Sequence, residues 1–132
     1  MFIKALSTEE IHLISCLLQD SITRYSWIRL DKNKFKIALN RFCWELEAEH
    51  RQRYRVHTLL IIHHIENMQN KNLQDNKDLK ILLNVSYYNN KLYFTFDNDA
   101  LLVLKVSEIK IFLYDVSKKW DTHIRELHHM IL

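Results

Sequence analysis

The chain has 132 residues and a net charge of +3 with neutral histidines, and this length predicts one domain over residues 1–132. It contains neither glycine nor proline, which excludes the glycine-dependent phosphate loop, dinucleotide-binding turn and nucleophile elbow. No segment has the pattern of a signal peptide or the length of a membrane span. Because Cys16 and Cys43 both lie among apolar residues, we expect two buried, reduced thiols in a cytoplasmic protein.

The first predicted element is a helix over residues 8–19. Ser7 followed three residues later by Glu10 is typical of a capping box, in which both side chains satisfy free N–H groups at the start of a helix. Ile11, Ile14 and Leu18 then recur at helical spacing. This spacing predicts an apolar face that packs on the core.

Alternation of apolar and polar residues predicts about seven short strands within residues 22–106. Turns are expected at 31–33, at Asn89-Asn90 and at 97–99, where Asn and Asp take the place of glycine at positive φ. The alternation changes parity at Asn40-Arg41. A β-bulge there is expected to keep both halves of the strand on the core.

A second helix is predicted over residues 107–120, followed by a tail over 121–132. Ser107 is a good N-cap. Five apolar side chains then trace one helical face: Ile109, Phe112, Leu113, Val116 and Trp120. The order of helix, strands and helix predicts an α+β fold that resembles a pleckstrin-homology-like domain. In that fold antiparallel strands form a partly open barrel or two packed sheets and the last helix closes one end, and the analogy carries no function.

Three stretches are similar to the L-Q-D, L-N-R-F-x-W-E and R-V-x-T stretches of a small alphaproteobacterial family, domain of unknown function 2948: Leu17-Leu18-Gln19-Asp20, Leu39-Asn40-Arg41-Phe42-Cys43-Trp44-Glu45 and Arg55-Val56-His57-Thr58. The similarity covers nearly the whole chain. The resemblance implies glycines near Leu59, Asn72 and the 97–99 turn, which this chain lacks. It implies no activity, because the family has none assigned. Plentiful Ile, Asn and Lys indicate an AT-rich genome, such as that of an obligate intracellular bacterium.

The most unusual group of side chains lies around the predicted bulge, and we interpret it as a partner patch: Asn40, Arg41, Trp44, Glu45, Arg53 and Arg55. In that interpretation a guanidinium beside an exposed aromatic ring is re-aimed toward solvent at the bulge. The alternative is structural. Arg41 is then held by Glu45 or by a helix C-terminus, while Phe42 and Trp44 belong to the core.

The sequence offers no paired acid and base and no metal-ligand spacing among its eight histidines. We therefore expect a non-catalytic interaction module, with no cofactor, that binds a protein partner. The alternative is a binder of nucleic acid or anionic lipid, because residues 24–55 carry nine bases and four acids, a net charge of +5. The basic sheet face of that alternative contains Arg24, Arg29, Lys34, Lys36, Arg53 and Arg55. Tyr25 and Trp27 would stack on single-stranded bases there.

Overall fold

The computed structural model describes residues 1–43, 55–74 and 79–116 of the chain, which form one antiparallel sheet of ten strands and one α-helix. The helix α1 covers Thr8–Leu18, and a single 3-10 turn, η1, covers Tyr25–Trp27. The first five strands are β1 (Phe2–Ala5), β2 (Ser21–Thr23), β3 (Ile28–Asp31), β4 (Lys34–Phe42) and β5 (Arg55–Ile62). The others are β6 (Ile65–Lys71), β7 (Lys80–Tyr88), β8 (Lys91–Phe96), β9 (Leu101–Val106) and β10 (Ile111–Asp115).

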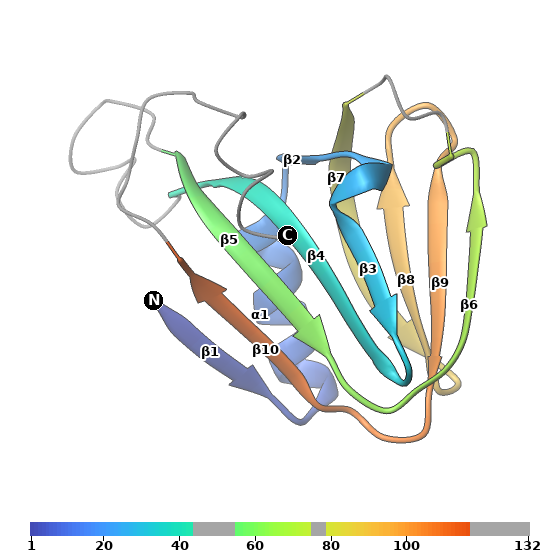
Figure 1. Cartoon of the computed structure of the whole chain (residues 1–132). Helices are drawn as coiled ribbons and strands as arrows, with labels where there is room; N and C mark the ends of the chain where they lie inside the picture. Colours follow the sequence, from blue (N-terminus) through green and yellow to red (C-terminus); the bar gives the residue numbers. More distant parts are fainter. Residues whose placement is uncertain (44–54, 75–78, 117–132) are drawn as a thin grey trace.

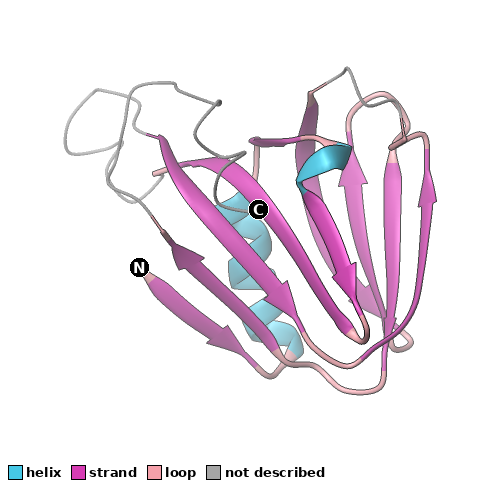
Figure 2. Cartoon of the chain, viewed as in Figure 1, coloured by secondary structure: helices cyan, strands magenta, loops and turns pink. Residues whose placement is uncertain are grey.

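The sheet is continuous and follows the order β1-β10-β5-β4-β2-β7-β8-β9-β6, with β3 paired to β4 outside this path. In Figure 1, β1, β10, β5 and β4 form the left half, β7, β8, β9 and β6 form the right half, and α1 lies behind the left half. Figure 2, from the same side, shows how strands dominate the described chain. The inner side of the curved sheet and α1 therefore enclose the core.

One hydrophobic core contains the inward side chains of both halves of the sheet. From the helix it includes Ile11, Ile14 and Leu18, as the helical spacing predicted. Ser15 lies on the same buried face, where its Oγ donates to Asn84 Oδ1 at 2.9 Å and accepts the Val85 N–H at 2.9 Å. This pair of bonds joins α1 to β7 where the register of β7 against β8 shifts. The polar position on the helical stripe thus has a structural role.

The predicted capping box is confirmed at the start of α1. The Glu10 N–H donates to Ser7 Oγ at 3.3 Å, and the Glu10 carboxylate accepts bonds from Ser7 Oγ and from the Leu6 N–H, both at 3.0 Å. These bonds, that from the Leu6 backbone first, hold the pKa of Glu10 below its ordinary value. The predicted helix over 8–19 is observed as Thr8–Leu18.

The predicted helix over 107–120 is wrong, because its described part contains the strand β10. Ile111 and Leu113 are buried and the intervening Phe112 is only half-buried, which is the alternation of a strand. Apolar residues at nearly every position from 109 to 116 fit both periods. β-branched and aromatic side chains favour the strand. Residues 117–120 and the predicted tail over 121–132 lie outside the described residues.

The predicted α+β fold, with about seven strands closed by a C-terminal helix in a pleckstrin-homology-like arrangement, is therefore wrong. The described chain has ten strands, and α1 packs on the inner side of the sheet. β1 was not predicted, because four residues are too short for alternation to stand out. β1 and β10 pair with each other at one end of the sheet, so the strand that was not predicted and the wrongly predicted helix concern the same edge.

The predicted β-bulge at Asn40-Arg41 is also wrong. β4 pairs with β5 in unbroken register from Phe35↔Ile62 to Phe42↔Arg55. The parity change has another cause, because both faces of this part of β4 are covered: Asn40 is 0% exposed and Arg41 is 1% exposed. A strand that is buried on both sides does not alternate.

Eight of the residues that the structure describes adopt positive φ, and six of them are Asn or Asp. The predicted turn at Asn89-Asn90 is confirmed, with φ values of 52° and 64°. Asn98 and Asp99 have positive φ in the predicted 97–99 turn, and Asn72 has a φ of 61°. Asn and Asp thus stand at two of the three places where the family resemblance implied glycines, since they tolerate this conformation best after glycine, whereas the third, Leu59, lies inside β5. In the 31–33 turn the positive φ falls on Lys32, not on an Asn.

The two cysteines differ in their surroundings. Cys43 is buried, as expected, but Cys16 is exposed and its Sγ lies 3.9 Å from His12 Nε2. Neither cysteine forms a disulfide. Cys16 faces solvent because it lies beside the buried stripe of α1 and not on it.

Candidate functional site

Arg41, the centre of the predicted patch, is held by a partner that the sequence did not indicate. Its Nε and Nη2 donate to the two carboxylate oxygens of Asp115 at 3.0 and 2.8 Å, and its Nη1 donates to the Phe42 carbonyl at 2.9 Å. Such a bidentate pair is strong because two charge-assisted bonds are fixed in one plane. Seventy-four positions separate the two residues, so no local spacing could have revealed the pair.

The Asp115 carboxylate ties four neighbouring strands together. It also accepts a bond from Thr58 Oγ1 of β5 at 2.8 Å, and the amino group of Met1, next to β1, lies 3.5 Å away. Burial by itself raises the pKa of Asp115, but the bonds and charge of Arg41, the Thr58 bond and the Met1 amino group together hold it below its ordinary value. The cluster therefore fixes the register of β1, β10, β5 and β4, and it is a structural feature.

The other described members of the predicted patch surround this cluster on β4 and β5. Arg55 Nη1 donates to the carbonyl and the side-chain oxygen of Asn40, both at 3.0 Å. The Arg55 guanidinium lies 3.6 Å from the centre of the Phe42 ring, a close cation–π contact. Trp44, Glu45 and Arg53 lie outside the described residues. Asn40 and Arg41 are buried, so the part of the patch that the structure describes offers a partner only Arg55, which is half-buried against the half-buried Phe42.

The predicted basic face divides into two separate groups. Arg29 of β3 lies directly opposite Lys36 of β4, and Lys34 is near them at the same end of the strand. Arg55 lies opposite Phe42, at the other end of β4. Arg24 packs 5.3 Å from the Trp27 ring. Trp27 is fully buried, so its ring offers no face to a nucleic acid base, and Tyr25 is half-buried against the core.

The outer side of the left half of the sheet in Figure 1 carries a different surface, which we call the aromatic–lysine face: Phe2, Lys4, Lys36, Leu59, Ile61, Phe112 and Tyr114. Strand register places these side chains in two rows across the sheet. One row runs from Lys4 through Phe112 and Ile61 to Lys36. The other contains Phe2, Tyr114 and Leu59. An apolar centre is thus flanked by a lysine on each side.

Phe112 is the centre of this face. Its ring stacks with that of Phe2 at 6.0 Å and meets the His63 ring edge-on at 5.3 Å. The ammonium groups of Lys4 and Lys110 lie 5.9 and 6.0 Å from its centre. Desolvation, followed by the charges of Lys34, Lys110 and His64, lowers the pKa of His63. The electrostatic potential here is therefore positive.

Sequence reasoning missed this face because it depends on β10 and β1. Both lysines, Phe2 and Phe112 are present in the printed sequence, but a helix over 107–120 places Phe112 in the core. With β10 as a strand, the same residues alternate and Phe112 faces outward. The signal that could have found it is the β-branched and aromatic content of the run Ile111-Phe112-Leu113-Tyr114, which favours a strand.

These features define a β-sheet protein with one packed helix in its described part, and one of its outward surfaces is an apolar sheet face bordered by lysines. The chain belongs to the family described as "Protein of unknown function (DUF2948)", whose family model matches residues 2–128, so the expected family similarity is confirmed. Neither the curated proteins nor the solved structures contain a match to it. Within the described ranges, no helix has the length and apolar character needed to cross a membrane.

Proposed function

We propose that this chain is a cytoplasmic, non-catalytic interaction module that binds an acidic protein partner through the aromatic–lysine face. The observation that carries the proposal is the row of Lys4, Phe112, Ile61 and Lys36. Neighbouring strands are about 4.8 Å apart, so the two lysines flank the apolar centre at a separation of roughly 14 Å. A partner segment with apolar side chains between two carboxylates is complementary to this surface in shape and charge.

Two further observations support a protein partner. Phe2 is 63% exposed although it stacks on Phe112, so a large apolar side chain faces solvent. The outward positions of β1, β10, β5 and β4 include no Asp or Glu within the described residues, so an acidic partner meets no like charge there. Exposed aromatic and apolar groups at the centre of a surface are typical of protein interfaces.

Binding of nucleic acid or anionic lipid has less support. The predicted basic residues form two groups at opposite ends of β4, and of the predicted stacking rings Trp27 is fully buried and Tyr25 is half-buried against the core. A salt titration distinguishes this alternative from a protein partner, because binding dominated by phosphate contacts weakens steeply with ionic strength.

The test is affinity capture from native cells with the full chain as bait. The bait is wild type, Phe2→Ser, Phe112→Ser, or Tyr88→Ser, which removes a 74% exposed ring from β7 as a matched control. We expect a protein that wild type and Tyr88→Ser retain and that both Phe variants lose, and purified partner should then bind with the same order of affinities. Thermal unfolding of each bait excludes misfolding. Capture that is independent of Phe2 and Phe112, or that disappears with nuclease, would contradict the proposal.

A further inference from the structure

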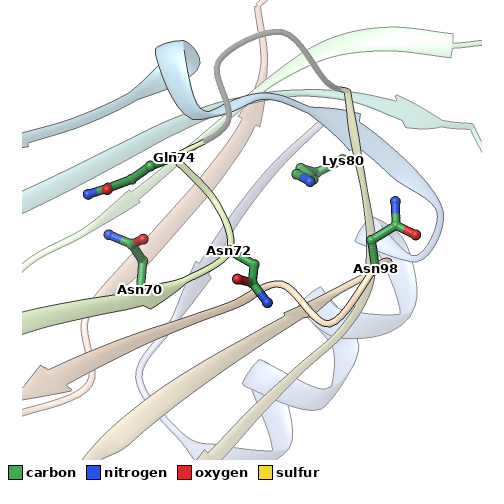
Figure 3. Close-up of a pocket in the computed structure, with 5 residues that line it drawn as sticks. All are labelled: Asn70, Asn72, Gln74, Lys80 and Asn98. Atoms are coloured by element: carbon green, nitrogen blue, oxygen red, sulfur yellow. The ribbon is translucent and has the colours of Figure 1, made fainter.

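A polar cavity of about 530 Å³ lies where β6, β7 and the turn between β8 and β9 meet (Figure 3). Among the described residues, five side chains line it, and all five are polar: Asn70, Asn72, Gln74, Lys80 and Asn98. Its volume is in the range of roughly 300–1,000 Å³ that small-molecule sites occupy. The cavity is on the half of the sheet that does not contribute to the aromatic–lysine face, so the two sites are independent.

The cavity forms because the inner side of the sheet becomes polar at this end. On β6, Met68 packs against the core, and Asn70, two residues later, lies on the same side of the strand. Leu73 is fully buried and fixes the loop that follows β6. Its exposed neighbours Asn72 and Gln74 are thereby held at the rim of the cavity.

Lys80 supplies the charge of the cavity. It is the first residue of β7, is 4% exposed, and points into the cavity in Figure 3. A surface lysine normally keeps its ammonium group in water while only its stem is covered. Among the described residues, none provides a hydrogen bond or ion pair to the Lys80 side chain. Its stem is buried while its ammonium group faces the cavity, so an anion placed there would gain a charge-assisted hydrogen bond.

The other lining side chains are carboxamides, which donate as well as accept hydrogen bonds. Asn72 is fixed by the bond from its Nδ2 to the Asp99 carbonyl at 3.1 Å. Asn98 is held in the left-handed conformation with a φ of 55°. None of the five lining residues is acidic. The cavity therefore combines one positive charge with several amide donors, as the recognition of an oxyanion requires.

We propose that this cavity binds a small metabolite through an oxyanion, a carboxylate or a phosphate, that pairs with the Lys80 ammonium group. Carboxamide N–H groups of the lining side chains complete the recognition of the anion. Asn70 and Asn72 contact the polar body of the ligand. This activity goes beyond the binding of a protein partner and uses none of the same residues.

The test is an NMR titration of the isotope-labelled full chain with malonate and with inorganic phosphate. We expect saturable shifts in the side-chain amide signals of the lining residues and in the Lys80 Cε signal. Malonamide, the uncharged counterpart of malonate, should cause much smaller shifts. Saturation by malonate alone identifies a carboxylate ligand, and saturation by phosphate alone identifies a phosphate ligand. The range should extend to about 50 mM, which covers a millimolar Kd.

Two variants make the cavity less positive, one by removing the Lys80 charge and one by adding a negative charge. Lys80→Met keeps an unbranched stem and should weaken probe binding roughly 10–100-fold, the effect of losing a charged hydrogen bond. Gln74→Glu places a negative charge at an exposed rim position, so it should also weaken binding without disturbing the core. Lys71→Gln is the matched control, because Lys71 is an exposed lysine at the end of β6 that does not line the cavity. It should bind each probe within about twofold of wild type.

Three results would overturn the proposal. One is the absence of saturable shifts with both anions in the wild-type chain. Another is equal binding of malonamide and malonate. The third is an equal loss of affinity in Lys71→Gln and Gln74→Glu, which would show general screening of surface charge. The Gln74 variant keeps the test decisive even where Lys80→Met unfolds the chain.

Discussion

Arg41 and Asp115 form a bidentate ion pair, with N–O distances of 3.0 and 2.8 Å, across the neighbouring strands β4, β5 and β10. The Arg41 side chain is 1% exposed and that of Asp115 is 13% exposed. Removing one member of such a pair leaves a buried charge without its counter-charge, which typically costs about 3–5 kcal/mol. We therefore expect Asp115→Asn to lower the free energy of unfolding by about that amount in urea unfolding.

The control for this prediction is Thr58→Val, which removes one bond to Asp115 but no charge and should cost about 1 kcal/mol. The double variant Arg41→Met with Asp115→Leu should be more stable than Asp115→Asn alone, because no unpaired charge remains. Equal losses in Asp115→Asn and Thr58→Val would show that the ion pair contributes nothing beyond a hydrogen bond.

The same pair predicts how stability depends on pH. The pKa of Asp115 is lower in the folded chain than the ordinary value of about 3.9, so the unfolded chain binds a proton more readily. Its contribution is complete above that ordinary value and is lost as the pH falls through the folded pKa. Between about pH 4 and pH 2, wild type should lose stability more steeply than Asp115→Asn. The free energy of unfolding is measured by urea unfolding at each pH, and an equal dependence on pH in the two chains would contradict this prediction.

Those parts of the fold could be predicted from the sequence in which neighbouring residues show one clear pattern. The Ser7–Glu10 cap, the buried stripe of α1 and the Asn89-Asn90 turn depend on neighbours within a few residues. β10 could not be predicted in the same way, because its apolar run fits a helix and a strand equally. The Arg41–Asp115 pair and the cavity around Lys80 depend on which strands become neighbours, and that is decided by the whole sheet.

Leu113 and Phe112 provide a direct test of β10. Leu113 is fully buried, and Leu113→Ala should cost about 2–5 kcal/mol through lost burial and a cavity. Phe112→Ala removes a half-buried ring from the outer side and should cost about 1 kcal/mol. Thermal or urea unfolding measures both. Similar large losses in the two variants would favour the helical face in which both side chains are buried.

Lys32 predicts a stabilising substitution. It has a φ of 57° in the turn between β3 and β4, a conformation that costs most residues about 1–2 kcal/mol and Asn less. Lys32→Asn should therefore raise the free energy of unfolding by roughly 0.5–1 kcal/mol. Lys34→Asn, two residues later in β4, should lower it, since Asn is unfavourable in strands. If both substitutions raise the free energy of unfolding, the cause is the loss of a lysine charge and not the backbone conformation.

His63 reports the potential of the aromatic–lysine face. Its pKa is lowered by desolvation and then by Lys34, Lys110 and His64, so the neutral imidazole is favoured in the folded chain. Its contribution to stability is complete above the ordinary value of about 6.5 and is lost as the pH falls below it. Lys110→Gln removes one of the nearby positive charges and should raise the His63 pKa in an NMR titration of its Cε1–H signal. Lys105→Gln, an exposed position on β9 that is absent from the groups acting on His63, should leave the His63 pKa unchanged.

A bound acidic partner should also raise the pKa of His63, whereas an uncharged apolar partner should lower it further through desolvation. The direction of the shift on binding therefore distinguishes a partner recognised by charge from one recognised by apolar contact alone.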